Sequence, residues 1–288
     1  MTNILAVGIA TLDIINTVDS YPAENAEVRA LSQRCCRGGN AANTLTVLQQ
    51  LGNQCSWLGV LSNEPSSALI HNDFTRSGIN YQSAYLYDGG KTPTSYVTLN
   101  KKNGSRTIVH HRDLPEFSFE SFKAVDLTPY DWIHFEGRNV AETVKMVLHA
   151  NTCAPNTPIS IEIEKQRPGI EELFPLANYL IFSHDYAVQQ GLEQPEELLY
   201  TVRQAAENTH IISTWGETGA YALNVDGTLH HSISFPPPII VDTLGAGDTF
   251  NAGLIHALSN HHDLGSALIE ACRLAGKKCG IEGFQPLN

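Results

Sequence analysis

The sequence lacks the features of a membrane protein and of a chain divided by a linker. No stretch approaches the ~20 consecutive apolar residues of a membrane-spanning helix, and no basic segment precedes an apolar run at the N-terminus. The 288 residues also contain no Pro/Gly/Ser-rich linker, internal repeat or low-complexity run. We therefore expect a cytoplasmic protein with one large domain and an appendage.

The cysteines and histidines lack the spacing of metal sites. Six cysteines follow no metal-ligand pattern and no regular framework, which is typical of reduced cytosolic thiols. The paired histidines have no further histidine four residues away, as a helical zinc site would need. Basic residues are few, and the formal net charge of -12 would repel nucleic acid and anionic membranes. We expect no disulfide and neither of these partners.

The familiar nucleotide-binding loops are also absent. The sequence contains no Gly-x-x-x-x-Gly-Lys-Ser/Thr loop. The Gly-Ala-Gly at residues 245–247 and the early run at 7–11 both lack the glycine pattern of a dinucleotide fingerprint. These absences exclude a P-loop NTPase and argue against a dinucleotide-dependent oxidoreductase.

Apolar runs and helical spacings alternate along most of the chain. Strand-like runs occupy residues 4–10, 57–61, 132–135, 159–163, 179–182 and 211–214, and helical stretches lie near 40–51, 66–77, 141–150 and 196–207. This alternation predicts an α/β fold with a mainly parallel central sheet.

Three segments depart from that alternation. Residues 94–99 and 106–111 are predicted to form an antiparallel hairpin around Asn103-Gly104, and residues 27–36 are strand-like with no helix behind them. We expect these segments to form a small separate sheet over the binding site. The expected boundaries are 1–12, 37–91 and 113–288 for the core, and 13–36 and 92–112 for the small sheet.

One motif places a carboxylate beside a turn of small residues. Residues 239–241 are predicted as a short buried strand, and residues 251–258 carry a helical apolar spacing. Between them, the amides of Gly245, Ala246 and Gly247 can approach an anion closely. Asp248 beside such an anion hole suits a general base that takes a proton from a hydroxyl attacking a phosphoryl group. The alternative is an ordinary helix start capped by Asp.

A second motif, Gly-Gly-Asn-Ala-Ala-Asn at residues 38–43, opens another predicted helix. Asn40 and Asn43 are three residues apart and so share one helical face. Their carboxamides supply donors and acceptors together, which suits the vicinal hydroxyls of a sugar better than phosphate. The alternative is an Asn cap with a structural second Asn. Asp13 is a third candidate, because it follows the run at 4–10 and is expected at the carboxyl end of a strand.

The motifs at 39–43 and 242–251 closely resemble the signatures of the ribokinase-like sugar kinases, also called the phosphofructokinase-B family. Further similar stretches run from 31–34 to 275–280, so the resemblance covers essentially the whole chain. It implies a three-layer α/β sandwich with a β-sheet lid that clasps a second copy to make a homodimer; the alternative is a lid that covers only the chain's own sugar site, as in monomeric relatives. It also implies transfer of a phosphoryl group from ATP with Mg²⁺ to a sugar, with Asp248 as the base and Gly245, Ala246 and Gly247 as the anion hole.

The resemblance assigns further residues to two binding sites. The positions that match the sugar site are Asp13, Gly39, Asn40, Asn43 and Asp248, and those that match the nucleotide site are Arg106, Trp215, Glu217, Gly219, Phe235, Gly245, Gly247 and Cys279. Many members carry Asn-x-x-Glu where this chain has Ser183-His184-Asp185-Tyr186, so the metal ligands stay unknown. Ser105 and His184 also depart from the family pattern, which leaves the nucleotide affinity open. Activation by K⁺ near Asp242 is left open too.

Within the family, the similar stretches most resemble the branch that phosphorylates ketohexoses. This implies that the acceptor is the 1-hydroxyl of a ketohexose such as fructose. The alternatives are a kinase of the same fold for ribose, an aldohexose, a sugar acid or a nucleoside, and a sugar sensor without catalytic activity. The intact Asp248 argues against the sensor.

Overall fold

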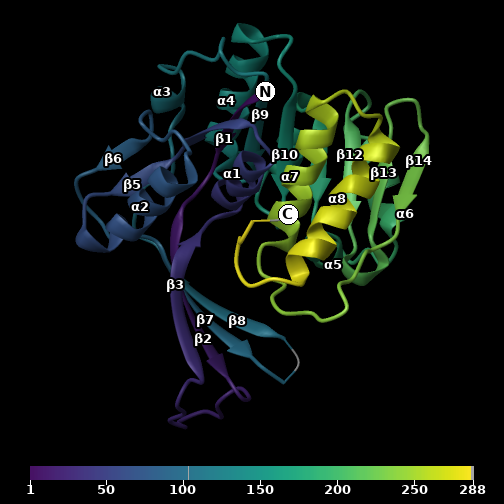
Figure 1. Ribbon diagram of the computed structural model, residues 1–288. Coiled ribbons are helices and arrows are strands. Elements are labelled where there is room, and N and C mark those ends of the chain that lie inside the picture. The colour runs from purple at the N-terminus through teal and green to yellow at the C-terminus, as the bar shows by residue number, and fades with distance from the viewer. Residues whose placement is uncertain (103, 287–288) are drawn as a thin grey trace.

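The central sheet has eight strands in the computed structural model, which describes residues 1–102 and 104–286 (Figure 1). Their order is β14 (Leu229–Ser232), β13 (Ala220–Leu223), β12 (His210–Thr214), β11 (Tyr179–Phe182), β10 (Ile159–Ile163), β9 (Trp132–Glu136), β1 (Asn3–Val7) and β4 (Gln54–Leu58). Neighbouring strands from β4 to β12 are parallel, and β13 and β14 run antiparallel at one edge. The prediction of a mainly parallel α/β sheet is confirmed.

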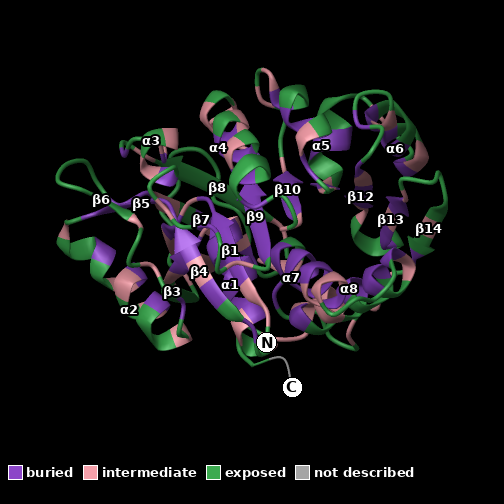
Figure 2. Ribbon diagram, turned by 90° about the horizontal axis from the view of Figure 1, so that it is seen from above, coloured by how far each residue is buried: buried purple, intermediate pink, exposed green. Residues whose placement is uncertain are grey.

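Helices bury both faces of this sheet, which explains why its strands are continuous apolar runs. Along β1, Leu5 and Val7 pack on one face, and Ile4 and Ala6 pack on the other. The second face is covered by α1 (Asn40–Gln50), α7 (Ala246–Ser259) and α8 (Leu264–Cys279), and the first by α3 (Phe119–Phe122), α4 (Val140–Cys153) and α6 (Pro195–Arg203) (Figure 2). The fold is the expected three-layer sandwich. The remaining helical segments are α2 (Ala68–Ser77), α5 (His184–Gln189) and the 3-10 helices η1 (Pro65–Ser67), η2 (Ile170–Leu176) and η3 (Gly216–Thr218).

Four further strands form a smaller sheet that projects from one end of the core (Figure 1). Its order is β3 (Ser32–Gly38), β2 (Thr11–Val18), β7 (Thr94–Asn100) and β8 (Arg106–His111). The predicted hairpin of β7 and β8 is present, and Asn103 of its turn lies outside the described residues.

Two strand predictions near the small sheet are wrong in their boundaries. The strand predicted at 27–36 begins only at Ser32, because residues 27–31 form a largely exposed irregular loop. The strand predicted at 4–10 ends at Val7, and the chain then turns into β2, which pairs with both β3 and β7. Asp13 therefore lies inside a strand and not after one. Buried and half-buried residues do not alternate regularly along β2, so its sequence lacks the pattern that predicts a strand.

The strand predicted at 239–241 is also absent. This segment is an extended loop beside α8, where the backbone N–H of Val241 donates to the carbonyl of Cys279 at 2.8 Å. Ile239 is 74% exposed, so the apolar composition of the segment does not reflect burial. The helix predicted at 251–258 begins earlier, at Ala246, and α8, β13, β14 and the two-stranded pair of β5 (Val60–Ser62) and β6 (Tyr85–Tyr87) were not predicted. Across residues 1–102 and 104–286, no helix is long and apolar enough to span a membrane.

Candidate active site

Two helices begin close together at one end of the central sheet. α1 begins after Gly39, with φ 105°, and α7 begins after Gly245, with φ 79°. Residues with a Cβ rarely adopt this left-handed backbone. At Gly39 a Cβ would also collide with the backbone carbonyl oxygen of Ile9. Glycine at these positions lets both helix starts face the same space.

Direct hydrogen bonds join the two helix starts. The Nδ2 of Asn43 in α1 donates to Oδ2 of Asp248 in α7 at 2.8 Å. The hydroxyl of Thr44 donates to the backbone carbonyl of Asp248 at 3.2 Å. The structure therefore brings together the two motifs that are about two hundred residues apart in the sequence.

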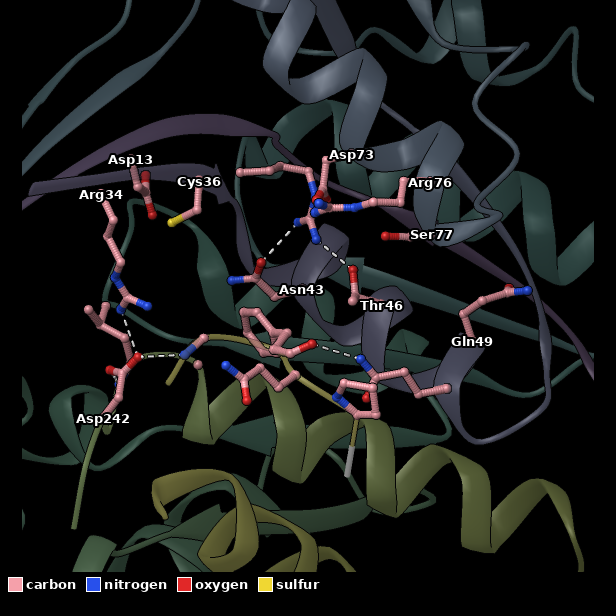
Figure 3. Close-up of a pocket in the computed structure, with 18 of the residues that line it drawn as sticks. Asp13, Arg34, Cys36, Asn43, Thr46, Gln49, Asp73, Arg76, Ser77 and Asp242 are labelled. Atoms are coloured by element: carbon pink, nitrogen blue, oxygen red, sulfur yellow. Dashed lines mark hydrogen bonds and ion pairs between the residues drawn. The ribbon is translucent and has the colours of Figure 1, made fainter. Parts of the chain in front are cut away.

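The turn before α7 separates two cavities. The first has a volume of about 650 Å³, and Figure 3 shows Asp13, Cys36, Asn43 and Asp242 among the side chains around it. The second has a volume of about 580 Å³ and lies toward β12, η3 and α8. Leu244 and Gly245 line the first cavity, whereas Ala246 and Gly247 line the second. A group held at this turn would be reached from both sides.

Asp248 directly follows this turn, is only 7% exposed and is not among the residues that line either cavity. Burial raises its pKa to about 7. The hydrogen bond from Asn43 and the charge of Arg37 oppose this rise, and the charges of Glu136 and Glu164 add to it. A carboxylate with a pKa near neutrality can accept a proton at neutral pH and then release it.

Glu162 is a second buried carboxylate that the sequence analysis missed. Its Oε2 accepts from the side-chain amide of Asn40 at 3.0 Å, and its Oε1 accepts from that of Asn251 at 2.9 Å. Burial and the charge of Asp248 raise the pKa of Glu162 well above its usual value. Asn40 is therefore fixed by Glu162 and is not among the residues that line the first cavity. An acidic residue inside the apolar run at 159–163 was the signal that could have revealed it.

Glu136, at the end of β9, was also missed. Its Oε1 accepts from the backbone N–H of Ala41 at 2.8 Å and from that of Ile9 at 3.2 Å. A Cβ at Gly8 would collide with the same oxygen. Burial raises the pKa of Glu136 as well. This carboxylate holds the start of α1 against β1, and its position directly after the apolar run at 132–135 was the available signal.

Asp13 reaches the first cavity from β2. Its Oδ1 accepts from the hydroxyl of Thr11 at 2.8 Å, and its Oδ2 occupies the space that a side chain at Gly38 would need. Asp13 and Asn43 therefore line the same cavity from the small sheet and from α1. The strand that carries Asp13 was not predicted.

Asp242, the first residue of the second motif, is held by four groups, one of which is the backbone N–H of Leu244, which donates to its Oδ1 at 2.9 Å. Its Oδ2 accepts from Arg34 Nη2 at 2.7 Å and from the backbone N–H of Gly283 at 3.0 Å. The fully buried Lys278 Nζ donates to its backbone carbonyl at 2.9 Å. Burial alone would raise the pKa of Asp242, but the Gly283 N–H and the charges of Lys278 and Arg34 hold it below its usual value.

The second cavity contains most of the residues assigned to a nucleotide. Its lining includes Glu217, Gly219, Phe235, Gly247 and Cys279. A Cβ at Gly247 would meet no atom within 4 Å, so the turn faces open space here. Such a space bounded by helix-start amides fits a phosphate chain.

Three residues assigned to the nucleotide site do not line this cavity, and one of them, Gly245, lines the first cavity instead. Trp215 flanks it, where its indole packs against His184 with ring centroids 4.6 Å apart. Arg106 is exposed on β8 and, as far as the described part of the chain goes, lines neither cavity. Ser183 caps α5, since its hydroxyl accepts from the backbone N–H of Tyr186 at 3.0 Å. Residues 183–186 therefore start a helix at this position.

The fold is an α/β sandwich with two adjoining cavities, and sequence comparison gives its class. The family model described as pfkB family carbohydrate kinase matches residues 1–286. The chain belongs to this family and is a carbohydrate kinase. It is 42% identical over 289 residues to ketohexokinase from Mus musculus, which covers 98% of this chain and 97% of that protein.

Solved structures agree on the fold. A ribokinase from Arabidopsis thaliana complexed with ribose and ATP has a TM-score of 0.80 at 17% identity, covering 98% of this chain and 94% of that one. A ribokinase from Thermotoga maritima has a TM-score of 0.78 at 20% identity, with the same coverage. At these identities the likeness concerns the fold alone.

Proposed function

We propose that the protein is an ATP-dependent kinase that phosphorylates the 1-hydroxyl of a ketohexose such as fructose. One observation carries the proposal: the buried Asp248 directly follows the turn that separates the two cavities. A sugar in one cavity and ATP in the other would meet at this turn. The 42% identity to a ketohexokinase over nearly the whole chain supports the ketohexose.

The first cavity is proposed to hold the sugar. Asp13 and Asn43 line it and offer an acceptor and an amide to its hydroxyls. Asp248 takes the proton of the attacking hydroxyl as the oxygen forms its bond to the γ-phosphorus. The bond from that phosphorus to the β–γ bridging oxygen breaks, and ADP leaves. Gly39 and Asn40 match the sugar site of the family but do not line this cavity: Gly39 shapes the start of α1, and the amide of Asn40 is held by Glu162.

The turn is proposed to stabilise the transferred group. The amides of Gly245, Ala246 and Gly247 lie at the start of α7, where the helix dipole favours negative charge, and the N–H of Ala246 also donates to the carbonyl of Thr243 at 3.3 Å. Charge that develops on the phosphoryl oxygens during transfer is thereby neutralised without rearrangement.

The second cavity is proposed to hold the nucleotide, with the assigned Glu217, Gly219, Phe235 and Cys279 in its wall and Trp215 beside it. When bound, Mg²⁺ neutralises charge on the phosphates. Among residues 1–102 and 104–286, no cluster of three His, Cys, Asp or Glu side chains is placed to hold a metal. The ion would therefore be held mainly by phosphate and water oxygens.

K⁺ does not fit at the carbonyl of Asp242. The Lys278 ammonium already donates to that oxygen and also approaches the carbonyl of Ile281 at 3.5 Å. A monovalent cation there would have to displace a fully buried positive charge. K⁺ has no part in the reaction proposed here.

The small sheet is proposed to act as a lid and as a homodimer clasp. Tyr96 lies opposite Val109 in the ladder of β7 and β8, so both side chains share one face. They are 50% and 66% exposed, and an apolar sheet face of this kind favours a partner. Closure of the lid would bring Arg106 toward the phosphates. Six free thiols support a cytoplasmic location.

The proposal is tested by incubating the protein with ATP, Mg²⁺ and a panel of ketoses, aldoses, sugar acids and nucleosides, and identifying products by mass. We expect phosphorylation of a ketohexose, and the position of the phosphate is read by NMR. Efficient phosphorylation of an aldose or nucleoside, with ketohexoses left unchanged, would contradict the proposed acceptor.

A further inference from the structure

Arg37 lies at the end of β3, enclosed by α1 and α2. Its side chain is 2% exposed, and its Cζ lies 5.4 Å from the centroid of the Phe74 ring. Its Nε donates to Oδ2 of Asp73 at 2.6 Å. Its Nη1 donates to Oδ1 of Asn43 at 2.9 Å, and its Nη2 donates to Oγ1 of Thr46 at 2.5 Å (dashed in Figure 3). Each of the three nitrogens of the guanidinium is thus bonded to a different side chain.

These contacts decide which way the amide of Asn43 faces. A guanidinium has donors and no acceptor, so the amide oxygen of Asn43 must face Arg37. The amide nitrogen must then face Asp248, to which it donates at 2.8 Å. With the amide reversed, its oxygen would lie against a carboxylate and both hydrogen bonds would be lost. Arg37 therefore ensures that Asp248 has a donor beside it.

We propose, resting on the function proposed above, that Arg37 is a positioning residue for the general base. Through Asn43 it holds Oδ2 of Asp248 in place and leaves Oδ1 to accept the proton of the sugar hydroxyl. It also favours the ionised form of the carboxylate. Arg37 acts on Asp248 through another side chain.

The charges around Asp248 explain why the base needs this support. Glu136 on β9, Glu162 on β10 and Glu164 after β10 are acidic neighbours, and burial raises the pKa of Asp248 to about 7. The Asn43 hydrogen bond and the positive charge of Arg37 act in the opposite direction. Without Arg37 both lowering effects weaken, so the pKa should rise and less of the base should be ionised at neutral pH.

Arg76 provides a matched control. Asp73 binds Arg37 through Oδ2 and Arg76 through Oδ1, the latter at 2.7 Å. The Arg76 side chain is 81% exposed, so it shares the same carboxylate from the solvent side. A substitution there perturbs Asp73 and α2 while the contact of Arg37 with Asn43 stays intact.

The experiment compares Arg37→Met, Arg37→Lys and Arg76→Met with the unchanged protein. The titration of Asp248 is followed by ¹³C NMR of labelled aspartate carboxyls, and its signal is assigned by its loss in Asp248→Asn. The pH dependence of turnover is measured in parallel. In Arg37→Met, we expect the titration and the acidic limb of turnover to move upward by about one pH unit. We expect a smaller upward shift in Arg37→Lys, which keeps the charge but cannot hold Asn43 and Thr46 together.

Because Arg76 also lines the first cavity, this control is read from the titration alone: Arg76→Met should leave the titration of Asp248 unchanged. An unshifted Asp248 titration in both Arg37 variants, or an equal shift in Arg76→Met, would overturn the proposal. Thermal unfolding checks each variant, and if Arg37→Met does not fold, Arg37→Lys decides. The titration of Asp248 can be measured without turnover. If the unchanged protein is inactive but the titration shifts in the Arg37 variants, only the proposed kinase reaction is contradicted. An active protein with unshifted titration contradicts the role of Arg37 alone.

Discussion

The buried ammonium of Lys278 donates to the backbone carbonyl of Asp242 at 2.9 Å and lies 3.4 Å from the carboxylate of the same residue. Lys278 is in the last turn of α8, and Asp242 precedes the turn that starts α7. One buried lysine thus fixes the approach to the anion-binding turn. Arg34 of β3 binds the same carboxylate, so the small sheet is joined to this turn as well.

Replacing Lys278 by Met should lower the free energy of unfolding by about 3 kcal/mol, because it leaves a buried carboxylate short of a partner. The control is Lys277→Met, since Lys277 is the exposed neighbour on the same helix. Its effect should stay within about 0.5 kcal/mol. Urea unfolding measures both. Equal losses in the two variants would show that the Lys278–Asp242 contact contributes little.

Replacing Asn43 by Ala should weaken sugar binding by ~1–3 kcal/mol, because hydrogen bonds to buried groups are lost, and replacing Asn40, which does not line the cavity, should weaken it less. ATP affinity should stay near normal, since the residues assigned to the nucleotide lie beyond the turn. Isothermal titration calorimetry with each ligand separates the two effects. If ATP affinity fell as much as sugar affinity, the substitutions would be damaging the fold and the sugar assignment would be wrong.

Asp248 should make the protein less stable as pH rises. An aspartate in the unfolded chain titrates near pH ~4, whereas burial raises the pKa of Asp248 to about 7 in the fold. Its contribution to stability is complete below pH ~4 and is lost as pH rises through the folded value. Asp248→Asn removes this titration. The free energy of unfolding of Asp248→Asn, compared with that of the unchanged protein, should therefore increase between pH 4 and 7 by up to ~4 kcal/mol.

Urea unfolding at several pH values tests this dependence. A stability difference between the two proteins that stays constant from pH 4 to 8 would show that Asp248 titrates at its ordinary value. The substitution keeps the size of the side chain, so packing changes should not vary with pH.

The exposed face of the small sheet should form the dimer interface. Tyr96→Glu or Val109→Glu places a charge on that face and should convert a dimer to a monomer at micromolar concentration. Tyr85→Glu is the control, because Tyr85 is also exposed, at 47%, but lies on β6 away from this sheet. Light scattering measures the mass. A monomeric unchanged protein would refute the clasp.

Short-range motifs made much of the site predictable. The turn at Gly245 and the start of α1 after Gly39 need residues with special backbone conformations, and such needs are visible in a sequence. Arg37 and Glu162 were not predicted, because their importance comes from the fold. Glu162 meets Asn40 across 122 positions, and Arg37 meets Asp73 across 36.

The fold was predictable where burial produces a pattern. Strands such as β10 are buried on both faces and therefore form continuous apolar runs. Two of the strand predictions failed because burial and apolar composition do not match in those segments. β2 is half-buried and mixes polar with apolar residues, so its pattern is weak. Ile239 and Ile240 are apolar but exposed. Their composition therefore predicted a buried strand in a segment that belongs to no sheet.

The role of Asp248 as general base is decided by the turnover of Asp248→Asn with ATP, Mg²⁺ and the ketohexose. The substitution keeps the size of the side chain and the start of α7 but removes the proton acceptor. We predict that turnover falls ~10²–10⁴-fold while calorimetry shows sugar binding largely kept. A variant that retains more than about a tenth of the original turnover would contradict the mechanism and remove Asp248 from that role.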